Sequence, residues 1–206
     1  MNKFLFAILG MLISTSCNGT KSTNSSSEDI RKGSKEMSQP SIVVFFSHAG
    51  ENYAVGNIKT GNTKIVANYI SEMTGAEQFE IATDKYDGMS YDALCELAKD
   101  EQQKGELPAY KGEIEDISKY NTIFIGGPVW WGTYPQVMFT FFKKHDLNGK
   151  RIIPFTTHEG SGLGNCVNDI KKTYPKADVQ DGLSIYGHKV NNSKEDVRKW
   201  LKKFGY

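Results

Sequence analysis

From residue 41 to the end of the chain, short continuous apolar runs alternate with stretches whose apolar residues have helical spacing. The runs are rich in β-branched and aromatic residues and predict strands at 42–46, 76–81, 122–125, 152–155 and 183–186. The intervening periodicity predicts helices at about 63–74, 90–104, 135–145, 163–173 and 194–204. Such alternation is typical of βαβ units, so the pattern predicts an α/β protein, a doubly wound three-layer sandwich around a five-stranded parallel sheet.

The beginning of the chain follows a different pattern. An apolar run at 4–13 leads through the small residues 14–16 to Cys17. As a helix this run would extend only about 15 Å, half of a bilayer core, so it predicts the apolar region of a signal peptide. The small residues before Cys17 resemble the lipobox of bacterial lipoproteins, which implies removal of 1–16 and acylation of Cys17. An ordinary signal peptide, cleaved at nearly the same place, is the alternative.

The next segment, 18–40, consists mainly of Ser, Thr, Asn, Gly, Lys and Glu. It cannot bury enough apolar surface to offset the entropy of ordering, so we expect a flexible tether. The expected organisation is a lipoprotein signal peptide at 1–16, a lipidated tether at 17–40 and one folded domain at 41–206. The protein is then exported and held at the periplasmic or cell-surface face of a membrane only through its lipid anchor.

Charge narrows the possible partners. The chain of 206 residues has 25 basic and 24 acidic side chains, a formal net charge of +1 at pH 7. Because binding to nucleic acid requires an excess of positive charge, this near-neutral composition argues against nucleic acid as a partner.

The segment after the first predicted strand, 47–63, has the features of a phosphate site. The hydroxyls of Ser47 and Thr63, the amide of Asn62 and the free N–H groups of a helix start form a nest suited to an anion. The glycine spacing up to Gly61 mimics a Walker A loop, but Asn62 occupies the position of its essential lysine. A terminal monophosphate is therefore favoured over a nucleoside triphosphate; a capped helix after a surface loop is the alternative.

The segments after the third and fourth strands also have unusual sequences. Trp130 and Trp131 are adjacent, so they cannot both point into the core, and at least one should be exposed or cover a ligand. A packed loop is the alternative. In 156–164, three glycines in five residues allow backbone amides to approach a flat ligand. The segment 156–164 lacks the nucleophile motif of hydrolases. His158 and Glu159 lack the spacing of zinc ligands on a helix, so no metal site is expected.

Together these segments resemble the flavodoxin-like flavoproteins, specifically a branch with an extended phosphate loop. The matching pieces are Phe46-Ser47, Gly50-Glu51-Asn52-Tyr53, Gly61-Asn62-Thr63, Gly126-Gly127-Pro128-x-Trp130-Trp131-Gly132 and Gly160-Ser161-Gly162-Leu163-Gly164. The resemblance covers about 42–204. It implies the strand order 2-1-3-4-5 and non-covalent FMN, with the ribityl phosphate in 47–63 and the isoalloxazine ring between 128–133 and 157–162.

The residues expected to bind FMN are Ser47, His48, Gly61, Asn62, Thr63, Pro128, Val129, Trp130, Trp131, Gly132, Thr157, His158, Gly160, Ser161 and Gly162. Ser47, Asn62 and Thr63 would hold the phosphate, and His48 would add a donor when protonated. Trp130 or Trp131 would form a wall against the ring. No side chain is an evident general acid or base, which suits a protein whose flavin supplies the chemistry.

Three functions remain open at this stage. The first is an FMN oxidoreductase that transfers electrons or hydride, for example from NAD(P)H to a quinone or another small acceptor. The second is a one-electron carrier that serves a redox protein, although 41–206 carry 20 basic and 21 acidic side chains and typical flavodoxins are strongly acidic. The third is a flavodoxin-fold binding module without flavin.

Two cysteines lie on predicted helices, Cys95 on the second and Cys166 on the fourth. In the order 2-1-3-4-5 the third helix separates them, so we predict no disulfide between them.

Overall fold

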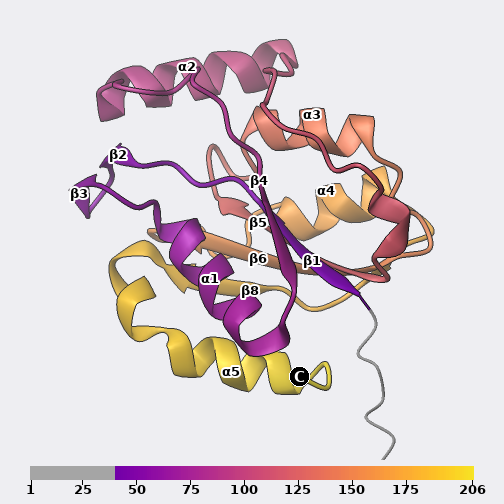
Figure 1. Ribbon diagram of the computed structural model, residues 1–206. Helices are drawn as coiled ribbons and strands as arrows, with labels where there is room; N and C mark the ends of the chain where they lie inside the picture. Colours follow the sequence, from indigo (N-terminus) through magenta and orange to yellow (C-terminus); the bar gives the residue numbers. More distant parts are fainter. Residues whose placement is uncertain (1–39) are drawn as a thin grey trace, which may run out of the picture. The chain divides into compact units, whose positions relative to one another are not determined.

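The computed structural model describes residues 40–206, and the predicted signal peptide, Cys17 and nearly all of the predicted tether lie outside this range. Six strands form one parallel sheet: β1 (Ser41–Phe45), β4 (Glu77–Glu80), β5 (Thr122–Pro128), β6 (Arg151–His158), β7 (Asp178–Val179) and β8 (Leu183–Tyr186). The order is β4-β1-β5-β6 (Figure 1), and both β7 and β8 pair with β6. The doubly wound parallel sheet is confirmed, and β4, β1, β5, β6 and β8 follow the predicted order 2-1-3-4-5; the sheet differs from the prediction in having six strands, because β7 also pairs with β6.

A proline explains why the last position of the sheet is divided. β7 pairs with the Arg151–Ile152 stretch of β6, and β8 pairs with its Phe155–His158 stretch. Pro154 lies between these stretches and has no N–H to donate to a neighbouring strand. The edge of the sheet therefore consists of two short strands, where the sequence pattern predicted only the second.

Helices cover both faces of the sheet (Figure 1). One face carries α1 (Asn62–Thr74) and α5 (Lys194–Lys202), and the other carries α2 (Tyr91–Lys104), α3 (Gln136–Lys144) and α4 (Cys166–Thr173). Two short 3-10 helices, η1 (Ile117–Lys119) and η2 (Gly187–Asn192), precede β5 and α5. Each α-helix begins within three residues of its predicted start.

The core has two halves, one on each side of the sheet. In β1, Val43 and Phe45 belong to the half beneath α1 and α5, whereas Ile42 and Val44 belong to the half beneath α2, α3 and α4. Both faces of a central parallel strand are thus buried, which explains why β1 reads as an unbroken apolar run.

The long segment between β1 and α1 contains a hairpin that the sequence pattern did not predict. It consists of β2 (Gly50–Asn52) and β3 (Gly56–Ile58), which pair antiparallel. Three residues are too few to show a period of two, so no strand was predicted here. The Glu51 carboxylate accepts a hydrogen bond from the Tyr91 backbone N–H at 2.9 Å, which connects the hairpin to the start of α2.

The two described cysteines, Cys95 and Cys166, are free thiols, which confirms the prediction of no disulfide. Burial raises the pKa of the Cys166 thiol to about 12, so this thiol is unreactive at neutral pH. Within 40–206, every helix is too short or too polar to cross a bilayer.

A buried carboxylate joins α2 to the loop that precedes it. Glu101 of α2 is fully buried; it accepts a hydrogen bond from the Tyr86 hydroxyl at 2.9 Å and lies 2.8 Å from the Lys85 ammonium. Burial, together with the charge of Glu101, raises the pKa of Tyr86, so the phenol stays protonated as a donor. A buried charge is tolerated only when it is paired, and therefore Lys85 and Tyr86 make this position possible.

We predict that Lys85→Met destabilises the protein by about 3 kcal/mol, because removal of one partner leaves a buried charge uncompensated. The control is Lys104→Met, which breaks an exposed pair between Lys104 and Asp100 on the same helix and should leave the free energy of unfolding nearly unchanged. Urea denaturation at pH 7 measures both losses. Equally small losses in the two variants would contradict an ionised Glu101.

Candidate functional site

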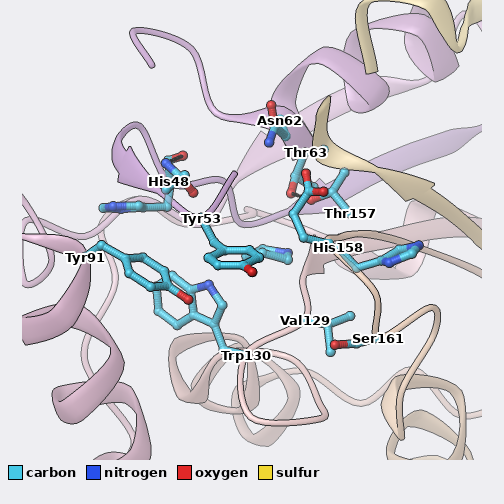
Figure 2. Close-up of a pocket in the computed structure, with 14 residues that line it drawn as sticks. His48, Tyr53, Asn62, Thr63, Tyr91, Val129, Trp130, Thr157, His158 and Ser161 are labelled. Atoms are coloured by element: carbon cyan, nitrogen blue, oxygen red, sulfur yellow. Dashed lines mark hydrogen bonds between the residues drawn. The ribbon is translucent and has the colours of Figure 1, made fainter. Parts of the chain in front are cut away.

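A pocket of about 290 Å³ opens at the carboxyl end of the sheet, where the segments after β1, β5 and β6 meet (Figure 2). Its lining consists of His48, Asn52, Tyr53, Asn62, Thr63, Tyr91, Pro128, Val129, Trp130, Thr157, His158, Glu159, Ser161 and Gly187. Nine of the fifteen predicted residues are in this set. The other six, namely Ser47, Gly61, Trp131, Gly132, Gly160 and Gly162, lie outside the lining.

The start of α1 forms one end of the pocket. Asn62 and Thr63 occupy the first turn of the helix, where backbone N–H groups have no preceding turn to supply acceptors. The buried hydroxyl of Thr63 lies 2.7 Å from that of Thr157 on β6, so this bond joins the first segment to the third. Backbone amides, a side-chain amide and two hydroxyls therefore meet at a helix start, a combination that suits an anion.

Ser47 acts as a support for this helix start. Its hydroxyl accepts a hydrogen bond from the Lys64 backbone N–H at 3.0 Å. A Cβ on Gly61 would collide with this hydroxyl and lie 2.6 Å from the His48 carbonyl oxygen. Only glycine therefore lets the end of β1 and the start of α1 approach this closely.

His48 is a buried residue of the pocket lining, and its ring centroid lies 5.9 Å from that of Trp130. Burial lowers its pKa, an effect that the charge of Asp87 and a hydrogen bond with the Glu51 backbone only partly oppose. The neutral ring is therefore the favoured form at pH 7, which weighs against the expected role of a protonated donor. Its Nε2 atom is buried without a hydrogen-bond partner among the described residues.

Trp130 forms an aromatic wall of the pocket, and two other aromatic rings pack against it. Its ring packs edge-on against Phe46, with centroids 5.5 Å apart, and against Tyr86, with centroids 5.2 Å apart. Since Tyr86 donates to the buried Glu101, the orientation of Trp130 is linked to the polar cluster of α2. The wall is thereby ordered before any ligand arrives.

Trp131 diverges from its neighbour, as the adjacent indoles required. It is 51% exposed, and its Nε1 donates to the Cys95 carbonyl of α2 at 2.9 Å. Its φ is +48°, a conformation that bulky residues rarely adopt. Backbone hydrogen bonds between Trp130 and Thr133, at 2.8 and 3.2 Å, close the turn around it. Trp131 therefore faces α2 and not the pocket.

The glycine-rich segment at the end of β6, 156–164, is ordered by hydrogen bonds within it. The His158 ring accepts a hydrogen bond from the Gly160 backbone N–H through Nδ1 at 2.9 Å and packs against the Tyr186 ring at a tilt of 49°, with centroids 4.4 Å apart. Burial is the main cause of a lowered His158 pKa, so the neutral ring dominates at pH 7. Because Nδ1 accepts, the proton of the neutral ring is on Nε2.

Glu159 is a lining residue that sequence reasoning did not select. Its Oε1 accepts from the His188 backbone N–H at 2.8 Å, and its Oε2 lies 2.6 Å from the His188 ring. Gly187 brings η2 so close that a Cβ there would collide with the Asn62 amide and lie 2.7 Å from Glu159 Oε1. Glu159 and His188 are 29 residues apart, so no local sequence pattern could predict their contact.

Tyr53 and Tyr91 form the rim of the pocket and were also missing from the predicted set (Figure 2). Their rings are 5.9 Å apart and tilted by 32°. Tyr53 is at the tip of the unpredicted hairpin, and Tyr91 begins α2. The hydrogen bond between the Tyr91 backbone N–H and Glu51, across 40 residues of sequence, holds the hairpin beside the start of α2, where the two rings meet.

Comparisons with known proteins agree with this architecture. Crystal structures of candidate flavoproteins from Bacteroides eggerthii and Bacteroides uniformis are each 26% identical to this chain. They match with TM-scores of 0.62 and 0.64, over 81% and 79% of this chain and 98% and 97% of their own. A flavoprotein from Lactobacillus acidophilus in complex with FMN is 19% identical, with a TM-score of 0.56, and the match covers 75% of this chain and 97% of that chain.

No curated protein sequence matches the chain. The family model described as flavodoxin matches residues 53–204, which include the start of α1, both Trp residues and the glycine-rich third segment. With the doubly wound sheet and the pocket at its carboxyl edge, this match over most of the chain shows that the protein belongs to the flavodoxin family.

Proposed function

We propose that the protein binds FMN non-covalently in this pocket and acts as an oxidoreductase that uses it. The observation that supports this most directly is the arrangement of the lining. A helix start with amide and hydroxyl donors lies at one end, and aromatic side chains lie at the other. FMN has the same polarity, with a phosphate at one end and a flat ring at the other. The FMN complex of a relative with this fold supports the same choice of cofactor.

The phosphate would lie at the start of α1. Among the described residues, the lining contains no Lys or Arg, so the phosphate charge would be met by the helix N-terminus and neutral donors. Asn62 and Thr63 would provide these donors, and Ser47 and Gly61 would hold the helix start in place. The phosphate would thus be bound by oriented dipoles and not by a salt bridge.

The ring would lie among the aromatic residues. Trp130 offers an ordered face, and Tyr53 and Tyr91 stand at the open rim. Aromatic side chains bury a large area and favour stacked or edge-on contacts with another flat ring. The tip of the hairpin, where Tyr53 is 62% exposed, would lose much of that exposure when the ring binds.

Glu159 would serve the ribityl chain between these ends. Both of its carboxylate oxygens contact His188, which leaves further lone pairs free to accept from sugar hydroxyls. A carboxylate beside a phosphate would be repulsive, so we expect its negative charge to be moderated by the donors of His188 and by the helix start. Glu159 would thereby select a hydroxylated chain over a bare phosphate ester.

FMN, when bound, supplies electron or hydride transfer, and the protein binds, orients and shields it. NAD(P)H as donor and a quinone or another small molecule as acceptor are the partners that we propose. Neither His158 nor His48 is favoured in its protonated form at pH 7, since burial lowers both pKa values. The polypeptide itself therefore contributes position more than proton transfer.

One observation favours the electron carrier as a second candidate. The near-neutral charge hides an asymmetry along the chain: residues 40–142 carry 14 acidic and 7 basic side chains, whereas residues 143–206 carry 7 acidic and 13 basic ones. Acidic residues of α2, among them Asp92 and Glu96, are exposed on the helix that borders the pocket. Such a surface would attract a basic redox protein and increase its rate of association.

The location of the protein is proposed from the sequence alone. We propose that Cys17 is acylated and that the folded domain stands on a tether at the surface of a bacterial membrane. Several acyl chains on one cysteine would give stable attachment, whereas a single chain gives only marginal binding.

The phosphate assignment predicts that Asn62→Ala weakens FMN binding by about 10-fold or more, since a hydrogen bond to a charged group contributes about 1.5–3 kcal/mol. Flavin fluorescence quenching measures the affinity. Asn68→Ala, an exposed position on the same helix, is the control and should bind FMN as wild type does. Riboflavin lacks the phosphate, so its affinity should be equal in all three proteins. An unchanged FMN affinity in Asn62→Ala would refute the assignment.

The two candidate functions differ in their electron donors. As an oxidoreductase, the FMN-loaded protein should bleach at 450 nm when NADH or NADPH is added anaerobically, without any other protein. An electron carrier should remain oxidised under those conditions and should take up electrons one at a time during dithionite titration. Rapid bleaching by either nucleotide would exclude a pure carrier.

Acylation predicts that Cys17→Ser moves the protein from the membrane fraction to the soluble fraction of an expressing bacterium. Metabolic labelling with an alkyne fatty acid should mark the wild type and leave the variant unmarked. Cys95→Ser is the control and should behave as wild type. A labelled Cys17→Ser variant would rule out lipid attachment at this residue.

A further inference from the structure

A second cavity, of about 470 Å³, adjoins the 290 Å³ pocket proposed for FMN, which we call the flavin-type pocket, on the side of α2. We call it the α2 cavity; it lies between α2 and the turn that contains Trp131. Tyr91, Val129, Trp130 and Ser161 line both cavities, so the two share a wall. A molecule in the α2 cavity would therefore lie directly beside the proposed position of the flavin ring.

The walls of the α2 cavity are mainly apolar and include two indole rings. Leu94 and Ala98 of α2 form its buried side, and Trp130 and Trp131 form the opposite side. Two indoles in the lining favour a planar ligand, because aromatic faces gain most contact from another flat surface.

Trp131 is held in this position by several interactions. Its indole N–H donates to the Cys95 carbonyl, its own carbonyl accepts from the Gln102 side chain at 3.1 Å, and the Lys99 ammonium lies 5.1 Å from its ring centre. The φ of +48° at Trp131 strains the backbone, and half of the side chain is exposed to water. Both features destabilise the folded protein. Strained residues that their surroundings fix in place are typical of functional sites.

The charges in the α2 cavity narrow the class of ligand. Asp92 is the one charged residue among its described lining residues, and its carboxylate would repel an anion. The remaining polar groups are uncharged. A hydrogen bond with Cys95 and partial burial raise the pKa of Tyr91 to about 12, so its phenol stays neutral and can donate to a carbonyl oxygen. Among the described residues that line the cavity there is no Lys or Arg, and the nearby Lys99 ammonium lies over the Trp131 ring.

We propose that the α2 cavity is the substrate site, which binds an uncharged planar molecule with carbonyl oxygens, a quinone, beside the flavin ring. This proposal rests on the proposed function, because it names the acceptor class of the same enzyme. Trp131 is the residue that determines specificity for a flat ligand, and Asp92 excludes anionic ones. The location of Trp131 outside the flavin-type pocket separates its role from cofactor binding.

The test measures binding of duroquinone, a neutral quinone whose ring is fully substituted and therefore does not add to thiols. Isothermal titration of the full-length protein is done with and without saturating FMN. Trp131→Ala should weaken duroquinone binding at least 5-fold and leave the FMN affinity within 2-fold of wild type. Leu107→Ala removes another exposed apolar side chain, outside the cavity, and should change neither affinity.

Charge selection is tested with anthraquinone-2,6-disulfonate, a dianionic quinone. The wild type should bind it at least 10-fold more weakly than duroquinone, and Asp92→Asn should reduce this difference. Equal binding of duroquinone by wild type and Trp131→Ala would overturn the proposal. So would competition between duroquinone and FMN, because the α2 cavity would then belong to the flavin site. Duroquinone binding that depends on Trp131 in a protein unable to bind FMN would support the cavity and refute the proposed function.

Discussion

The close contact between the end of β1 and the start of α1 is the feature on which the site depends. Gly61 allows the approach, and the Ser47 hydroxyl secures it through the Lys64 backbone N–H. The hydroxyl bond between Thr63 and Thr157 then fixes this helix start to β6. Because these groups are buried or nearly so, the amides of α1 are oriented before a ligand binds, which reduces the entropy cost of binding.

The aromatic side of the site depends on a different constraint, the buried charge of Glu101. Its partners Lys85 and Tyr86 keep α2 against the loop before it, and Tyr86 in turn packs on Trp130. The position of the pocket wall and the width of the cavity beside it are thus both set by α2. A change in this polar cluster should therefore alter the position of the residues that line both cavities.

Much of the fold could be predicted from local patterns. Strands such as β1 are buried on both faces and read as continuous apolar runs, and α5 has a clear apolar stripe through Val197, Trp200 and Leu201. The hairpin of β2 and β3 was missed because three-residue strands have no measurable period. The split of the last strand was missed because the effect of Pro154 depends on which strands lie beside it.

By itself the sequence determined the succession of strands and helices along the chain and the three segments that meet at the carboxyl edge of the sheet. It also determined that Trp130 and Trp131 diverge. These features follow from local periodicity and side-chain geometry. Only the tertiary structure decided that Ser47 supports a helix start, that burial keeps His48 neutral, and that Tyr53 meets Tyr91. It also placed Glu159 beside Asn62 by bringing Gly187 between them. Desolvation and contacts across 29 or 40 residues arise only when the chain is folded, so no local pattern encodes them.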